Sequence, residues 1–229
     1  MALIHQTTLK PTKLELLTDW LPSRAWYAGT GAAPELRKAG GFRLDDPEGE
    51  VGIEFMVVTD VSGAAPVTYH VPLSYRGAPL DGAEDGLVGT TEHGVLGKRW
   101  VYDAAHDPVA VGELLALLQG RAQAQAQNET DVPDRSVTAE FDGPEFGSSV
   151  GPLSIADDER GTRILAKTAG VAAAHVELRI RRVLGKQEAT AGQPAPQGHI
   201  TADWKLPEDG GTERDRFVEA SAGPDVREL

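Results

Sequence analysis

The chain has 229 residues, of which 40% are hydrophobic and 25% charged, a composition typical of a soluble globular protein with one large or two small domains. Its 35 acidic residues outnumber its 22 lysines and arginines, and the formal charge of -13 argues against binding to nucleic acids or anionic membranes. The absence of cysteine excludes disulfides, thiolate zinc sites and thiol catalysis.

The first predicted element is a short amphipathic helix over residues 12–20. Thr12 and Glu15 have the spacing of a capping box, and the leucines that follow recur at helical intervals. Pro22 then marks the end of the helix, because proline cannot continue it.

Two alternating segments, 51–58 and 67–75, are predicted to pair as an antiparallel hairpin. The only strand-like piece before them is 42–44. Both faces of 51–58 are largely apolar, which indicates a central strand. Pro72 has no N–H to donate, so its part of the second strand should lie at an edge or a bulge, and an edge can accept a partner.

Residues 76–91 read as a long connection rich in Gly, Pro and Asp, and 100–102 as a short strand. A helix is predicted over 107–118, with Asp107 as its N-cap and Pro108 in its first turn. Its leucines form one apolar stripe, so we expect the helix to lie across one face of the sheet.

Residues 121–135 lose this apolar pattern and read as a fraying helix that leads into a linker. We therefore predict two domains, 1–130 and 131–229, the second ending in a flexible tail. The fold class is α+β: a curved antiparallel sheet with two short helices, followed by a small antiparallel β module without a helix of its own. The strands expected in that module are 137–141, 163–167, 175–184, 199–206 and 214–219, with an exposed hairpin loop at 186–197.

The N-terminal residues contain no apolar run of signal-peptide length, and 18 uninterrupted apolar residues occur nowhere in the chain. We therefore expect a cytoplasmic protein.

Several sequence motifs occur in an order that resembles one known family. A leucine-rich helix closes in WLP and precedes an aromatic pair before glycine; then come VPLSYR, EHGVLGKRWVYD and a helix start at DPV. In this order they resemble the N-terminal cap domain of actinobacterial maltokinases and related sugar kinases, over roughly residues 10–120. Free-standing proteins of this kind are often called α-glucan branching proteins.

The resemblance implies a non-catalytic accessory or regulatory protein linked to trehalose, maltose or α-glucan metabolism, because in the family the cap sits over the amino lobe of the kinase. The catalytic loop and acidic metal motif of the kinase lobe have no counterpart in this chain. Lys98 follows a glycine, but Glu92 and Arg99 stand where a phosphate loop needs Gly and Ser or Thr. A branching enzyme is excluded by size, since its barrel alone needs about 250 residues.

The segment from 68 to 103 holds the densest group of aromatic and charged residues. Aromatic faces with planar polar groups at the rim suit a sugar or a peptide. Tyr69 and Tyr75 lie on the buried side of their strand, however, so a core role is the stronger reading for the aromatics. The candidate binding residues for protein or sugar are Arg76, Asp85, Glu92, His93, Lys98, Arg99, Trp100, Tyr102 and Asp103.

No catalytic residue, cofactor or metal is expected. Glu92, His93, Asp103, His106 and Asp107 are potential metal ligands, but their spacing fits no established ligand pattern. The predicted mechanism is docking, through the edge strand or the 76–99 loop, onto a kinase or a glucan or trehalose enzyme, or onto a second copy.

Two alternatives to docking stay open. One is a carbohydrate-binding sensor. The other is an enzyme built around Glu92, His93 and Asp103, either a reduced, ATP-dependent sugar phosphotransferase or a sugar-modifying activity.

Overall fold

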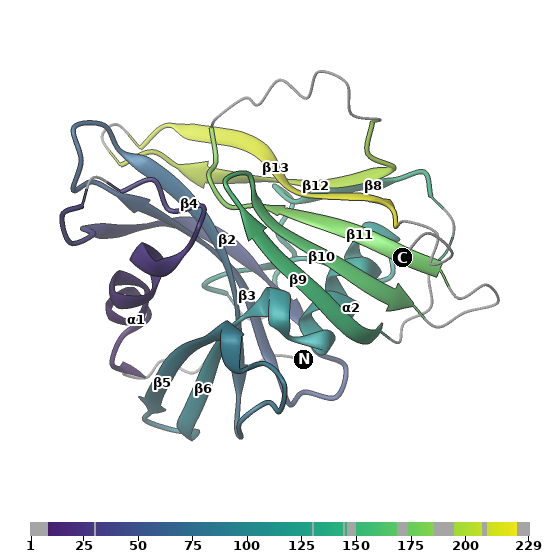
Figure 1. Ribbon diagram of the computed structural model, residues 1–229, viewed down its shortest axis with the longest axis horizontal. Helices are drawn as coiled ribbons and strands as arrows, with labels where there is room; N and C mark the ends of the chain where they lie inside the picture. The colour runs from purple at the N-terminus through teal and green to yellow at the C-terminus, as the bar shows by residue number, and fades with distance from the viewer. Residues whose placement is uncertain are drawn as a thin grey trace.

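The structure is a computed structural model that describes residues 9–29, 31–129, 131–143, 145, 150–168, 174–185, 195–207 and 210–223. Across these ranges the chain forms two curved antiparallel sheets, one of seven strands and one of six, and two short α-helices. Figure 1 shows the helix α2 between the two sheets. The prediction of antiparallel sheets with two short helices is thereby confirmed.

The first sheet has the strand order β1-β5-β6-β4-β3-β2-β7. Its strands are β1 Leu9–Lys10, β2 Leu36–Asp45, β3 Gly52–Asp60, β4 Val67–Arg76, β5 Leu87–His93, β6 Gly97–Asp103 and β7 Gln125–Ala126. The predicted hairpin is β3 and β4, which pair antiparallel from Gly52 opposite Tyr75 to Asp60 opposite Val67. As its two apolar faces predict, β3 lies inside the sheet.

The second sheet has the order β8-β12-β13-β11-β10-β9. Its strands are β8 Thr138–Phe141, β9 Val150–Asp158, β10 Gly161–Thr168, β11 Ala174–Arg181, β12 Gly198–Lys205 and β13 Thr212–Ala222. The sequence predicts a small module of five strands here. The structure adds β9, which alternation did not reveal, and brings α2 against the same sheet.

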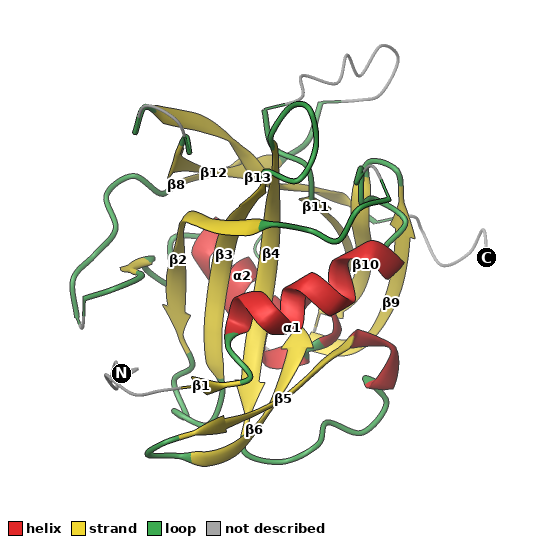
Figure 2. Cartoon of the chain, turned by 90° about the vertical axis from the view of Figure 1, so that its left-hand side faces the viewer, coloured by secondary structure: helices red, strands yellow, loops and turns green. Residues whose placement is uncertain are grey.

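The helix α1, Lys13–Trp20, begins at the predicted capping box. The Thr12 hydroxyl accepts a hydrogen bond from the Glu15 amide at 3.2 Å, and the Glu15 carboxylate accepts one from the Thr12 amide at 2.7 Å. Leu17 and Trp20 are buried against the first sheet. Figure 2 shows α1 crossing the sheet on the face opposite α2.

The helix α2, Pro108–Leu118, begins at Asp107, whose carboxylate accepts a hydrogen bond from the Val109 amide at 3.0 Å. Its buried residues surround most of the helix: Ala110, Val111, Gly112, Leu114, Leu115, Ala116, Leu117 and Leu118. A helix that is apolar on most sides must be covered on most sides. It therefore lies between two sheets, and not on one face of a single sheet as its stripe of leucines predicts.

Two apolar clusters follow from this arrangement. The larger joins the inner faces of β2 and β3, α2, and the inner face of the second sheet. The smaller lies under α1 and takes in Trp26 and the other faces of β3 and β4. Both halves of the chain thus contribute to one core, and the domain boundary near residue 130 stays a prediction.

Two segments differ from their predicted form. The connection 76–91 contains most of β5, which pairs with β6 from Leu87 opposite Tyr102 to His93 opposite Gly97. The stretch 121–135 is not a fraying helix, because it contributes β7 to the edge of the first sheet beside β2. Both strands are polar and half-exposed, so their sequences lack the apolar alternation that marks a strand.

The edge of β4 that Pro72 predicts is present but occupied. β4 pairs with β6 only from Leu73 onward. Before that point the segment after β11 lies beside β4: the His70 amide donates to the Arg182 carbonyl at 2.9 Å, and the Leu184 amide donates to the Thr68 carbonyl at 2.9 Å. Docking of another protein on this part of β4 would have to displace the chain's own backbone.

Most of the predicted loop 186–197 and the predicted flexible tail, residues 224–229, lie outside the described residues. Within the described ranges, neither helix has the length and apolar character needed to cross a membrane.

Candidate functional site

The predicted site region forms the β5–β6 hairpin. Glu92 pairs with Lys98 across the hairpin, and both side chains are exposed. His93 closes the turn, since its Nδ1 accepts hydrogen bonds from the amides of Val95 at 3.3 Å and Leu96 at 3.1 Å. The two residues that His93 holds are apolar, yet Val95 is 62% exposed and Leu96 46%. The hairpin tip, residues 93–98, is therefore an ordered turn that presents apolar side chains to solvent.

Arg76 belongs to a structural ion pair. Its Nε and Nη2 donate to the two carboxylate oxygens of Asp107 at 2.7 and 2.6 Å, and Asp107 is fully buried. The hydrogen bonds with Asp107 are the main reason that the pKa of Arg76 is raised. Because Asp107 also caps α2, this pair joins the end of β4 to the start of α2. Arg76 is therefore not available as a docking residue.

Asp103 also lies in a buried ion pair. The Nη2 of Arg182, whose side chain is fully buried, donates to Asp103 Oδ2 at 2.5 Å. Asp103 Oδ1 accepts from the Ala105 amide at 3.1 Å, and Arg182 Nε donates to the Thr162 hydroxyl at 2.8 Å. These bonds connect β6 of the first sheet with β10 of the second. Asp103 thus has a structural partner that is 79 residues away in the chain.

The aromatic pair before Gly29 also serves packing. The guanidinium carbon of Arg182 lies 5.0 Å from the centroid of the Trp26 ring, and the ring of Tyr27 stacks on Tyr69 with centroids 5.4 Å apart. The Tyr27 hydroxyl donates to Asp60 at 2.8 Å. Burial, followed by this bond, raises the pKa of Tyr27 well above its ordinary value. The pair fixes the chain after α1 onto β4.

The remaining candidates are divided between the core and the surface. Tyr102 is buried, and its hydroxyl accepts a hydrogen bond from the Leu80 amide at 2.9 Å. Trp100 and Arg99 are half-buried, and the Lys98 ammonium lies 4.9 Å from the Trp100 ring centroid. Asp85 is exposed in the short 3-10 turn before β5. Of the nine candidates, the surface therefore presents Glu92, Lys98 and Asp85.

The structure does not bring Glu92, His93 and Asp103 together. Glu92 lies opposite Lys98, and Asp103 follows five residues farther along β6, which corresponds to roughly 17 Å of strand. Among the described residues, no three His, Asp or Glu side chains gather in the manner of metal ligands.

Sequence reasoning missed a buried glutamate beneath α1. Glu54 on β3 is nearly inaccessible and pairs with Lys13, while Tyr75 and Gln127 each donate a hydrogen bond to it at 2.7 Å. Burial alone would raise the pKa of Glu54, but the charge of Lys13 and the hydrogen bonds outweigh it and lower the pKa. The sequence signal for this site was the charged residue Glu54 within the largely apolar strand β3, since a buried charge needs partners.

His70 is a second buried titratable group that the sequence did not single out. Its ring lies 4.4 Å from that of Phe217, and its Nδ1 is 3.2 Å from the Arg181 carbonyl oxygen. Burial, and then the charge of Arg182, lower the pKa of His70 to about 3. At neutral pH His70 is therefore an uncharged member of the core.

Comparison with known protein families shows which part of the chain resembles a known domain. Residues 20–107 match the family model of the maltokinase N-terminal cap domain. The matched segment runs from the end of α1 through β2–β6 to the cap of α2, and it contains the β5–β6 hairpin and both members of the Arg76–Asp107 pair. The predicted resemblance is confirmed over this segment: residues 20–107 are similar to the maltokinase N-terminal cap domain.

Proposed function

We propose that the protein is a non-catalytic accessory protein of maltose, trehalose or α-glucan metabolism, and that it docks through the β5–β6 hairpin onto an enzyme of that metabolism. The metabolic assignment rests on the match to the maltokinase cap. The observation that carries the docking is the hairpin tip, where Val95 is 62% and Leu96 46% exposed side by side.

Single exposed apolar residues are common on protein surfaces and need no explanation. Here two adjacent ones occupy an ordered turn, next to a stretch of strand with a free side. Among the described strands, β6 pairs with β4 only over Trp100–Asp103, so Gly97–Arg99 have a strand partner on the β5 side alone. Backbone groups on such an edge can accept an added strand, while Val95 and Leu96 supply apolar anchors.

Charge favours a particular kind of partner. Lys98 lies in the free edge, and a lysine there discourages indiscriminate strand pairing. A partner that places a carboxylate opposite Lys98 would satisfy it. Because Arg76 and Asp103 are engaged within the chain, the docking surface consists of the hairpin tip with Glu92 and Lys98.

The test is binding of the purified chain to purified enzymes, beginning with the catalytic region of a maltokinase, by titration calorimetry. Val95→Asp should weaken binding by about tenfold or more, because it places a charge in the centre of the contact. The matched control is Val132→Asp: Val132 is 39% exposed but far from the hairpin in sequence, in the stretch beside β7. Equal affinities of the two variants, or no binding to any enzyme of this metabolism, would refute the proposal.

A further inference from the structure

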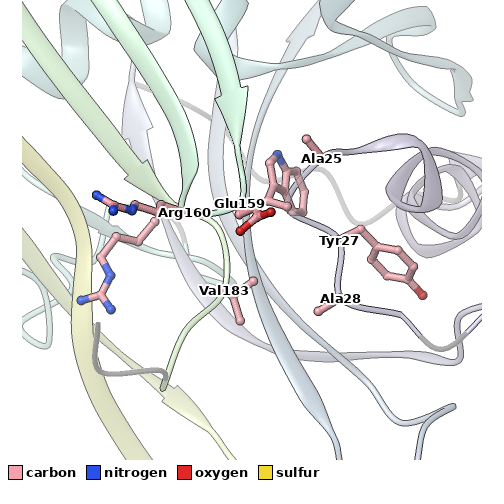
Figure 3. Close-up of a pocket in the computed structure, with 8 residues that line it drawn as sticks. Ala25, Tyr27, Ala28, Glu159, Arg160 and Val183 are labelled. Carbon is pink, nitrogen blue, oxygen red and sulfur yellow. The ribbon is translucent and has the colours of Figure 1, made fainter. Parts of the chain in front are cut away.

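A cavity lies where three distant segments meet. It has a volume of about 290 Å³ and is lined by residues 25–28 after α1, by Glu159 and Arg160 in the β9–β10 turn, and by Arg181 at the end of β11 and Val183 after it. Figure 3 shows Glu159 between Arg160 on one side and the 25–28 segment on the other. None of these residues belongs to the hairpin proposed for docking.

The walls of the cavity are held by contacts already described. Arg182, between two of the lining residues, is fixed by Asp103 and stacks on Trp26. The Tyr27 hydroxyl donates a hydrogen bond to Asp60, and the Tyr27 ring points away from Glu159 in Figure 3. The Trp26 and Tyr27 side of the cavity is thus preformed, which lowers the free-energy cost of binding a ligand, while Glu159 and Arg160 reach the cavity from an exposed turn.

The lining offers both donors and acceptors. The guanidinium groups of Arg160 and Arg181 donate, and the carboxylate of Glu159 accepts. Trp26 also borders the cavity, and its Nε1 hydrogen is buried without a hydrogen-bond partner in the described part of the chain. A buried donor of this kind calls for an explanation such as a bound molecule.

Charge and size narrow the ligand class. Arg181 is paired with Asp215 at 3.0 Å, and the other arginine of the lining, Arg160, directly follows Glu159 in the chain, so the formal charges of these four residues cancel. No surplus positive charge is left for a phosphate. The volume lies at the lower end of the range of about 300–1,000 Å³ found for small-molecule sites. A neutral ligand that both donates and accepts hydrogen bonds over the length of one or two sugar rings fits these limits.

We propose that this cavity binds a neutral mono- or disaccharide, with Glu159 accepting from its hydroxyl groups and Arg160 donating to them. The site differs from the loop at 76–99 that the sequence indicated for sugar binding. The inference does not depend on the docking of the hairpin, since it uses different residues and a different surface.

The test combines thermal unfolding and saturation-transfer NMR with glucose, maltose, trehalose and glucose 6-phosphate at millimolar concentrations. At least one neutral sugar should raise the Tm of the native chain and show transfer. Glu159→Gln and Arg160→Ala should each weaken that sugar about tenfold, because the first removes the charge of the accepting group and the second removes the donating guanidinium. Both side chains are exposed at a turn, and Arg163→Ala, exposed on β10 but outside the cavity, is the control that should bind normally.

Each other outcome overturns the proposal. These outcomes are binding of none of the sugars, binding of the phosphorylated sugar alone, or equal binding by Glu159→Gln, Arg160→Ala and the native chain. The hairpin variant Val95→Asp should bind sugar normally, so failure of docking and failure of sugar binding are told apart.

Discussion

The buried pair of Asp103 and Arg182 allows a quantitative prediction for Asp103→Asn. The substitution keeps the side-chain oxygen that accepts from the Ala105 amide, but it removes the charge 2.5 Å from a guanidinium whose side chain is 0% exposed. The rest of that guanidinium has little compensation: Nε donates to Thr162, while Nη1 has no partner among the described residues. Breaking such a pair costs about 3–5 kcal/mol, and the retained amide places this variant near 3 kcal/mol.

The assay is urea unfolding followed by circular dichroism, with Asp85→Asn as the control because Asp85 is exposed. The control should change the free energy of unfolding by less than about 0.5 kcal/mol. The double variant Asp103→Leu with Arg182→Met removes both charges, so it should lose only about 1 kcal/mol, chiefly the cap at Ala105. A loss below about 1 kcal/mol for Asp103→Asn, or a double variant as unstable as the single one, would show that the pair does not stabilise the junction.

Two further predictions concern His70 and Arg76. With a folded pKa of about 3 and an unfolded pKa of about 6.5, His70 takes up a proton only on unfolding between these values, so stability should fall by up to about 1.4 kcal/mol per pH unit as the pH drops. His70→Phe should flatten this slope between pH ~6.5 and ~4.5 in urea titrations, and an unchanged slope would contradict the assignment. Arg76→Ala leaves Asp107 buried without its cation and should cost about 2–4 kcal/mol. Lys98→Ala on the exposed hairpin should cost almost nothing, and similar melting temperatures for both variants would refute the structural role of Arg76.

Local signals predicted the elements that local chemistry determines. Thr12 with Glu15 and Asp107 with Pro108 marked the starts of both helices, because a capping side chain is only two or three residues from the amide that it accepts from. The β3–β4 hairpin followed in the same way from alternation on either side of a short turn. The match over 20–107 also agrees with motifs that lie close together in the sequence.

Contacts between distant residues could not be predicted in this way. Alternation along β11 hinted that Arg182 shares the side of its apolar neighbours, but its partner Asp103 comes from another sheet. The cavity was missed for the same reason, since Trp26, Glu159 and Arg181 come from three separate segments. Asp103 and Arg76 were predicted to lie at the surface because their ion-pair partners, Arg182 and Asp107, are distant in the sequence.

The position of α2 affects how the protein can be divided. One side of the helix contacts the first sheet, and the second sheet covers the other side. A chain cut near residue 130 would therefore expose the apolar side chains of α2, β2 and β3 to solvent. Large exposed apolar surfaces favour self-association of a protein. A fragment that ends near residue 130 is therefore expected to aggregate in solution, because it lacks the C-terminal strands that cover this apolar surface.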